Sequence, residues 1–414
     1  MISANSQPQS GDGQKTSLKR SLTLPLLTLY GLGVTIGAGI YVLVGATAAK
    51  AGFYAPVSFL LAAAVVAFTS FSYSELATRY PVSAGEAAYV RHGFNSRTLA
   101  LIVGLMVVLS GVVSSAAISI GATAYLGHLI ALPPAVLTVL IILILGAAAA
   151  WGILESVTVA AILTLIEIAG LIFVIAYGFT LKPDLLADFG RLIPPLEPVA
   201  WSAIVSAGLL AFFAFVGFED IANVAEEVKD PRRNLPRAII LTLIISTILY
   251  LVVVAVVVLS VPMSKLVVSA SPLALVFENA SDTSKSVFIL IASIATINGV
   301  LIQMIMSSRI LYGLASQGEL PAKLAYVSPL TRTPVVATAL VAAIVLALAL
   351  FLPIDELAKR TSQIVLVVFI TVNLSLLRLK LRGEPAQGDV FQVPIWVPVT
   401  GFLTCLLLLL SGLM

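Results

Sequence analysis

The chain has 414 residues, of which 60% are hydrophobic and 10% are charged, and its formal net charge is +3. Ordinary soluble domains are about 45–50% apolar and about 25% charged, so a soluble protein of this composition could not cover its surface, and lipid is the expected solvent. The single cysteine, Cys405, excludes an intrachain disulfide and a thiolate metal site, and two histidines are too few for a metal cluster, so we expect no metal and no cofactor.

The first segment, residues 1–20, is polar and rich in Ser, Gln and Gly. It ends in Lys15, Lys19 and Arg20. We expect a disordered cytoplasmic tail. No short apolar stretch with a small-residue cleavage site follows it, so the sequence predicts no removable signal peptide.

Eleven apolar runs follow, and each approaches or exceeds the roughly 20 residues that a membrane-spanning helix needs. Each run is continuously apolar, whereas barrel strands would be short segments in which apolar and polar residues alternate. The sequence therefore predicts an all-α membrane protein, a polytopic bundle of about eleven transmembrane helices. The runs lie near 22–48, 54–77, 98–127, 133–151, 157–180, 200–224, 236–260, 286–315, 334–352, 359–378 and 394–413.

Positive charge is distributed unequally between the two sides of this topology. Sixteen of the 23 Lys and Arg residues fall in the N-terminal tail and in alternate loops, and seven fall on the other side. Positively charged loops favour the cytoplasmic side. We therefore expect a multi-pass protein of the cytoplasmic (inner) membrane, with a cytoplasmic N-terminus and a C-terminus outside.

The first and sixth runs are both interrupted by glycine. "VTIGAGIYVLVG" (34–45) contains Gly37 and Gly39, and "AFFAFVGFEDIANVAEEVKDP" (211–231) contains Gly217. Interrupted helices at matching places in two halves of a chain point to a transporter binding site, because backbone freed at membrane depth must line a cavity or be buried in protein. Free amides suit a carboxylate and free carbonyls suit an ammonium, so the pattern indicates a zwitterionic amino acid.

Four stretches then carry a family resemblance. They are "TIGAGIYVL" (35–43), "YSELATRYPVSAGEAAYV" (73–90), "FFAFVGFEDIANVAEEVKDPRRNLPRAI" (212–239) and "SSRILYGLASQGELPAKLAYV" (307–327). Together they make the chain resemble the amino acid–polyamine–organocation transporters, which have the leucine-transporter fold. The resemblance implies a core of five plus five inverted helices, broken first and sixth helices, and alternating access.

The resemblance also implies boundaries and site residues. The expected segments are the tail 1–20, a first five-helix repeat 21–180, an extracellular loop 181–199, a second inverted repeat 200–378, and a linker with an extra helix 379–414. Phe213 falls where some members place an aromatic gate over the substrate. The expected substrate-binding residues are Thr35, Ile36, Gly37, Ala38, Gly39, Phe213, Ala214, Val216 and Gly217.

Two buried carboxylates are the candidate coupling groups. Glu167 lies in the fifth run where some proton-coupled members carry a lysine and sodium-coupled members bind sodium, and Glu219 follows the sixth-run break. An ionised acid at membrane depth is costly, so it is protonated, paired or functional. Protons are the expected coupling ion. Sodium is the alternative, with Ser307 and Ser308 as candidate hydroxyl ligands.

Other polar residues have more ordinary interpretations. Asp220, Glu226 and Glu227 approach the cytoplasmic end, where we expect them to meet Lys229, Arg232 or Arg233 as a gate or a surface ion pair. Glu75 and Arg79, one helical turn apart, form a similar expected pair. Polar groups of the eighth run, among them Asn298 and Gln303, are expected to link neighbouring helices.

The sequence therefore predicts a secondary active transporter of amino acids, proton-coupled, with sodium symport or amino acid/amine exchange as alternatives. It predicts no enzyme, because it has no serine–histidine pairing, no histidine–acid metal motif and no phosphate loop. A channel would favour repeated filter loops or rings of charge. A non-transporting amino acid sensor would have the same sequence features. The expected partners are an amino acid and the lipid bilayer, with no nucleic acid, and the sequence leaves the oligomeric state open.

Overall fold

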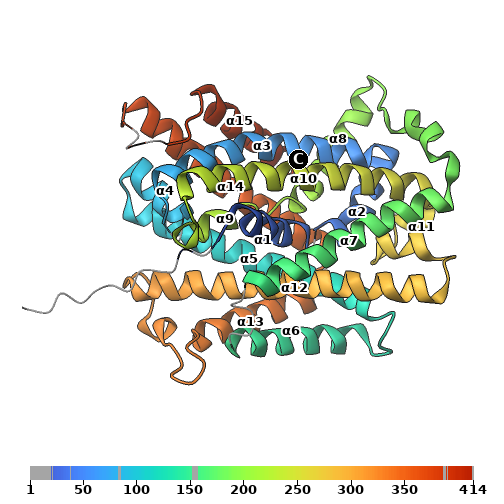
Figure 1. Cartoon of the computed structure of the whole chain (residues 1–414), viewed down its shortest axis with the longest axis horizontal. Helices are drawn as coiled ribbons and strands as arrows, with labels where there is room; N and C mark the ends of the chain where they lie inside the picture. The colour runs from blue at the N-terminus through green and yellow to red at the C-terminus, as the bar shows by residue number, and fades with distance from the viewer. Residues whose placement is uncertain are drawn as a thin grey trace, which may run out of the picture.

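The chain folds into a bundle of α-helices whose long members run side by side along the longest axis of the molecule (Figure 1). The computed structural model describes residues 20, 22–37, 39–82, 85–151, 157–385, 388 and 390–412, without the side chains of 157–159. Within these ranges there is no strand, and the one isolated β-bridge joins Leu22 to Val228. The expected all-α bundle is confirmed.

Within the described residues, the first half of the chain supplies seven α-helices and the second half eight. The first seven are α1 (Leu24–Ile36), α2 (Gly39–Ala51), α3 (Ala55–Arg79), α4 (Gly85–Phe94), α5 (Arg97–Leu126), α6 (Pro134–Trp151) and α7 (Val157–Leu181). Eight more follow: α8 (Pro198–Phe213), α9 (Asp220–Asn223), α10 (Pro231–Ser260), α11 (Met263–Leu266), α12 (Asp282–Ser316), α13 (Val335–Phe351), α14 (Ile354–Leu381) and α15 (Trp396–Ser411).

Local sequence explains many of the helix starts. Pro134, Pro198 and Pro231 occupy the first turns of α6, α8 and α10, where a missing amide hydrogen costs nothing. The side chains of Ser96 and Ser281 accept hydrogen bonds from amides in the first turns of α5 and α12. The boundaries of the long helices therefore follow from ordinary capping chemistry.

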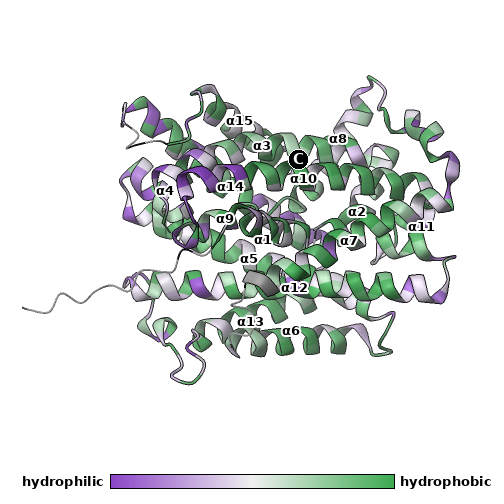
Figure 2. Ribbon diagram, in the orientation of Figure 1, coloured by the Kyte–Doolittle hydropathy of each residue, from purple (hydrophilic) through white to green (hydrophobic). Residues whose placement is uncertain are grey.

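Apolar residues cover the middle of the bundle, and polar residues gather at its two ends (Figure 2). Seven described segments are long and apolar enough to cross a membrane, and the first of them, Leu24–Arg79, contains two of the expected runs. Three shorter apolar helices, α8, α13 and α15, coincide with the remaining runs. α8 and α15 have 16 residues each, about 24 Å, so each is shorter than a hydrocarbon core of about 30 Å. The division into two inverted repeats stays a prediction.

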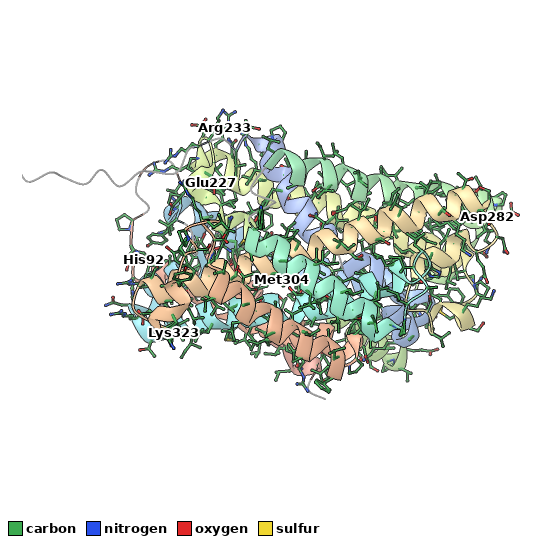
Figure 3. The ribbon with its side chains drawn as sticks, turned by 90° about the horizontal axis from the view of Figure 1, so that it is seen from below. His92, Glu227, Arg233, Asp282, Met304 and Lys323 are labelled. Carbon is green, nitrogen blue, oxygen red and sulfur yellow. The ribbon has the colours of Figure 1, made fainter. Side chains whose placement is uncertain are left out.

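The charged ends agree with the topology inferred from the sequence. Figure 3 shows His92, Arg233 and Lys323 at one end of the bundle and Asp282 at the other, with Met304 between them. His92, Arg233 and Lys323 belong to loops expected in the cytoplasm, and Asp282 to a loop expected outside. We call the first end the cytoplasmic end from here on.

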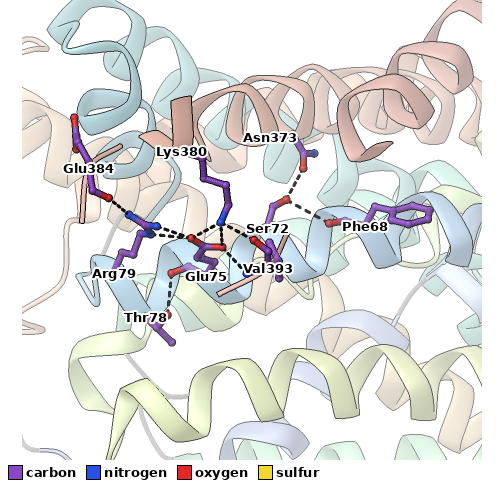
Figure 4. A network of polar contacts seen from close by, with 9 residues as sticks. All are labelled: Phe68, Ser72, Glu75, Thr78, Arg79, Asn373, Lys380, Glu384 and Val393. Carbon is purple, nitrogen blue, oxygen red and sulfur yellow. Dashed lines mark hydrogen bonds and ion pairs between the residues drawn. The ribbon is translucent and has the colours of Figure 1, made fainter. Parts of the chain in front are cut away.

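A buried ion cluster closes part of the cytoplasmic end (Figure 4). The carboxylate of Glu75 on α3 accepts hydrogen bonds from Arg79 Nη2 at 2.7 Å, from Lys380 Nζ at 2.9 Å and from the Val393 amide at 2.8 Å. Glu75 is 0% exposed. The expected pairing of Glu75 with Arg79 is present, but its interpretation as a surface pair is wrong, because α14 and the segment before α15 cover it.

Candidate functional site

The first interruption separates α1 from α2. α1 ends at Ile36, and the amide of Gly37 donates to the carbonyl of Gly33 at 3.2 Å. Helical structure resumes at Gly39, and Ala38, a predicted binding residue, lies outside the described residues. Thr35, Ile36, Gly37 and Gly39 are all buried. The interruption is present where the glycines predict it.

The second interruption separates α8 from α9. Residues 214–219 form turns between Phe213, the last residue of α8, and Asp220, the first of α9. Gly217 has a φ of +121°, a conformation that side chains with a Cβ rarely adopt. A Cβ at Gly217 would also lie 2.9 Å from the Val34 carbonyl oxygen of α1. This glycine therefore permits both the turn and the close contact between the two interrupted helices.

The two interruptions meet. A Cβ at Gly39 would lie 2.3 Å from the Cα of Ala214, so the backbones of α2 and the second interruption touch. The hydroxyl of Tyr250, on α10, lies 2.8 Å from the Thr35 carbonyl oxygen and 2.9 Å from the Ala214 carbonyl oxygen. These two oxygens are therefore within about 6 Å of each other. The two interruptions therefore face each other within the bundle.

Tyr250 is a residue that the sequence interpretation missed. It is fully buried and is the one hydroxyl-bearing ring in the apolar stretch of α10. A tyrosine hydroxyl carries one hydrogen, so it can donate a full hydrogen bond to only one of the two carbonyls at a time. A lone tyrosine in an apolar span is the signal that could have drawn attention to it.

Glu167 lies in the middle of α7 and is fully buried. The side-chain amide of Asn298, on α12, donates to Glu167 Oε1 at 2.8 Å. Glu167 Oε2 and Asn298 Oδ1 are buried, and none of the described residues donates a hydrogen bond to either. The pair thus has three acceptor oxygens and a single donor group, the Asn298 side-chain amide, which binds Oε1. A buried acceptor without a donor is unfavourable, and one added proton or cation would satisfy it.

The surroundings place this carboxylate beside the first interruption. α7 and α12 both contact α1. A Cβ at Gly33 of α1 would meet Thr164, one turn before Glu167, and a Cβ at Gly37 would lie 3.4 Å from the Ala295 carbonyl, one turn before Asn298. The Glu167–Asn298 pair therefore lies where α1, α7 and α12 converge.

Glu219 and Asp220 lie at the cytoplasmic side of the second interruption and border a small cavity. Glu219 Oε2 accepts from the amide of Gly217 at 2.8 Å, so this carboxylate binds backbone freed by the interruption. Asp220 is buried, and Gln303 of α12 donates to its Oδ2 at 3.4 Å. The expectation that Asp220 meets a basic residue at the cytoplasmic end is wrong, because its side chain turns into the bundle.

Ser307 and Ser308 are separated from Glu167. They follow Asn298 on α12 by nine and ten residues, which is about 14 Å of helix. Ser307 lines the same cavity as Asp220, and the Ser308 hydroxyl donates to the Ile305 carbonyl of its own helix at 2.8 Å. The structure therefore groups Ser307 with Glu219 and Asp220 and brings neither serine to Glu167.

Another buried carboxylate lies on the cytoplasmic side of α9. Glu86, on α4, is 2% exposed, and the Tyr73 hydroxyl of α3 lies 3.5 Å from its Oε1. Burial raises the pKa of Glu86 to about 7, and the neighbouring Asp220 adds to the rise, whereas hydrogen bonds from its own amide, Tyr73 and Asn223 oppose it. Nothing in the sequence distinguishes Glu86 from an exposed loop acid, so it was not a candidate before the structure.

Comparison with known proteins agrees with this arrangement. The amino acid permease family model matches residues 22–414. The branched-chain amino acid permease BcaP of Bacillus subtilis is 30% identical over 96% of this chain and 89% of its own length. The vacuolar cationic amino acid transporter 4 of Arabidopsis thaliana is 31% identical over 90% of this chain and 64% of its own. The methylthioribose transporter of Bacillus subtilis is 28% identical over 94% and 87%.

A solved structure shows the same fold. A mutant form of the manganese transporter of Eremococcus coleocola superposes with a TM-score of 0.66 at 17% identity, over 94% of this chain and 86% of that one. With a family match over nearly the whole chain and two interrupted helices that meet in the bundle, this chain belongs to the amino acid permease family of multi-pass membrane transporters.

Proposed function

We propose that this protein is a secondary active transporter that moves amino acids across the cytoplasmic membrane by alternating access, coupled to protons. One observation carries the proposal: the Thr35 and Ala214 carbonyls, each from a different interrupted helix, converge on the Tyr250 hydroxyl. Because that hydroxyl can donate fully to only one of them, an acceptor remains for the ammonium group of a substrate.

The amino end of α2 suits the other pole of an amino acid. α2 has 13 residues and begins at Gly39, which packs on the backbone of Ala214. The first amides of a helix have no partner within the helix and carry partial positive charge, so they favour a carboxylate. In this proposal both interrupted helices therefore contribute backbone groups to one zwitterionic ligand. The relatives named as amino acid permeases and transporters support the same substrate class.

Glu167 is the proposed carrier of the coupling proton. A proton on Oε2 would turn an acceptor that no described residue satisfies into a donor. Without the proton, a buried ionised carboxylate has a single side-chain donor and becomes costly. Protonation thus favours one packing of α7 and α12 against α1 and deprotonation another, which is the two-state behaviour that alternating access requires.

Sodium coupling, substrate exchange and a non-transporting sensor are the competing functions. Glu219 is the competing proton site, because it binds the Gly217 amide at the second interruption. The experiment is uptake of labelled amino acids into proteoliposomes, with the pH and sodium gradients varied separately, for the wild type, Glu167→Gln and Glu219→Gln.

The proposal expects accumulation that follows the pH gradient in the wild type. Glu167→Gln should still exchange internal for external substrate but should no longer accumulate it against a gradient. Proton-driven accumulation that survives in Glu167→Gln and is lost in Glu219→Gln would assign the proton to the other carboxylate. Accumulation that follows sodium and ignores pH would contradict proton coupling, and binding without flux would identify a sensor.

A further inference from the structure

A cavity of about 20 Å³ lies on the cytoplasmic side of the second interruption. Its walls come from α5, α12 and the segment between α8 and α9. The residues that matter for its chemistry are Ser110, Val216, Glu219, Asp220, Gln303 and Ser307. Val216 belongs to the interruption itself, so the cavity adjoins the proposed site for the substrate backbone. It is large enough for a group about the size of one water molecule.

The polar groups that line the cavity offer mainly acceptors, because the amide and hydroxyl donors among them point at protein oxygens. The Ser110 hydroxyl already donates to the Val107 carbonyl at 2.8 Å, which leaves its oxygen lone pairs as acceptors. The Gln303 amide is directed at Asp220. Two carboxylates complete the set, and among the described residues that line the cavity there is no Lys, Arg or His. A ligand that fits this lining must therefore bring hydrogen-bond donors and positive charge.

Among the residues that the structure describes, no donor lies at ordinary hydrogen-bond length from the Asp220 carboxylate. Its two side-chain donors, Gln303 Nε2 and Asn223 Nδ2, lie at 3.4 and 3.5 Å, beyond the usual range of about 2.7–3.2 Å. The side chain is nevertheless buried, at 6% exposed. Glu219, in contrast, holds the Gly217 amide at 2.8 Å. Of the two carboxylates, Asp220 is thus the one that can accept a further, shorter hydrogen bond.

We propose that this cavity binds the primary ammonium at the end of a basic amino acid side chain. The inference rests on the proposed function, since it needs the α-amino and α-carboxyl groups to lie at the two interruptions. An ammonium carries three donors and a full charge, which match Asp220, Glu219 and the Ser110 oxygen. It is also compact enough for a cavity of this size, whereas the planar guanidinium of arginine is larger.

The test compares ligands that differ only at this group. L-lysine and L-norleucine have side chains of equal carbon length, and only lysine ends in an ammonium. Binding to the purified full-length protein is measured from the ligand-dependent rise in its unfolding temperature. We expect lysine to bind about 10- to 100-fold more tightly than norleucine, the range of a hydrogen bond to a charged group, and L-arginine to bind less tightly than lysine.

Two variants separate the cavity from general charge effects. Asp220→Asn should reduce the preference for lysine over norleucine by at least about tenfold, because lysine loses its charged partner and norleucine has no side-chain ammonium to lose it. Asp282→Asn makes the same chemical change at the exposed outer end of α12, far from the cavity, and should keep the wild-type preference.

The outcomes also distinguish this inference from the proposed function. Norleucine binding as tightly as lysine to the wild type would overturn the ammonium site and leave amino acid transport intact. Equal binding of arginine and lysine would overturn the assignment to a primary ammonium. An unchanged preference in Asp220→Asn would remove Asp220 from the site. Failure of every amino acid to bind or to be taken up would instead contradict the proposed function.

Discussion

At the scale of single residues, the Tyr250 hydroxyl connects the two interrupted helices. It lies within hydrogen-bond distance of one carbonyl from each. Both carbonyls lie at the end of their helix, where the regular helical hydrogen bonds stop. Buried backbone carbonyls are nearly always hydrogen-bonded. The tyrosine therefore stabilises both interruptions by linking their carbonyls.

Tyr250→Phe removes this contact and keeps the ring. We expect the apparent KM for the transported amino acid to rise at least about tenfold and the free energy of unfolding to fall by about 1–3 kcal/mol, because two buried carbonyls lose their donor. Tyr177→Phe, on the outer part of α7, is the control, since that ring packs on Phe277. Unchanged uptake and stability in Tyr250→Phe would show that the hydroxyl does not organise the site.

At the scale of elements, Glu75 joins three segments of the cytoplasmic end. It lies on α3, Lys380 lies on α14, and Val393 precedes α15, as Figure 4 shows. Lys380 Nζ also donates to the Val393 carbonyl at 2.6 Å. Two cations and one amide satisfy the fully buried carboxylate, and the three charged side chains together carry a net charge of +1. Removing one member of such a cluster leaves the others buried without their partner, so the cost of their desolvation is no longer offset.

Glu75→Gln should therefore lower the free energy of unfolding by about 3–5 kcal/mol. Glu75→Gln combined with Lys380→Met should cost less than the sum of the single variants, since the double variant removes a cation and its partner together. Glu356→Gln breaks an exposed pair with the same i,i+4 spacing and should cost less than about 1 kcal/mol. Additive effects in the double variant would mean that Glu75 and Lys380 do not act as a pair.

α4, between the second and third expected spans, carries a buried carboxyl that makes the stability of the fold depend on pH. The Glu86 carboxyl has a pKa of about 7 in the folded protein against an ordinary value of 4.5, because burial disfavours its charge. The groups facing it are the Tyr73 hydroxyl of α3 and Asn223 and Asp220 of α9. A carboxyl with a raised folded-state pKa binds its proton more tightly in the folded protein, so stability falls as pH rises from about 4.5 through 7.

Glu86→Gln abolishes this titration. We expect the variant and the wild type to unfold at similar temperatures near pH 5, and the variant to be more stable at pH 8 by about 3 kcal/mol at full ionisation. Unfolding temperatures measured across this pH range, with the exposed Glu197→Gln as the control, check the sign. A wild type that gains stability relative to Glu86→Gln as pH rises would contradict a buried, neutral Glu86.

At the scale of the whole molecule, the sequence was informative wherever composition or local chemistry decides the structure. The length of the apolar runs predicts the bundle. Gly37, Gly39 and Gly217 predict the interruptions, because only glycine readily permits the positive φ of Gly217 and the close backbone contact at Gly39. The depth of Glu167 in its run predicts its burial.

The side-chain partners required knowledge of how each helix is rotated about its axis. Apolar membrane helices show little periodicity from which that rotation could be read. Three placements therefore appear only when the helices are packed. They are Asn298 opposite Glu167, Tyr250 opposite both interruptions, and Asp220 inside a cavity rather than at the cytoplasmic end.

The expected orientation of the molecule in the membrane rests on the unequal charge of its two ends. Leu196, between α7 and α8, and Leu330, between α12 and α13, are both highly exposed and are expected outside and in the cytoplasm, respectively. With the buried Cys405 replaced by alanine, Leu196→Cys should react with an impermeant maleimide in intact cells, and Leu330→Cys only after lysis. The reverse pattern would invert the topology, and equal labelling of both would contradict the number of spans between them.

The central claim is that an amino acid crosses the membrane at the contact between the two interrupted helices. Counterflow of labelled amino acids into preloaded proteoliposomes tests it most directly, with Gly39→Val beside the wild type. A side chain at Gly39 meets the Ala214 backbone at 2.3 Å, whereas a Cβ at Gly313 on α12 has nothing within 4 Å, so Gly313→Ala is the control. We predict counterflow for the wild type and Gly313→Ala, and none for Gly39→Val although it inserts and folds. Normal counterflow by Gly39→Val would contradict the account.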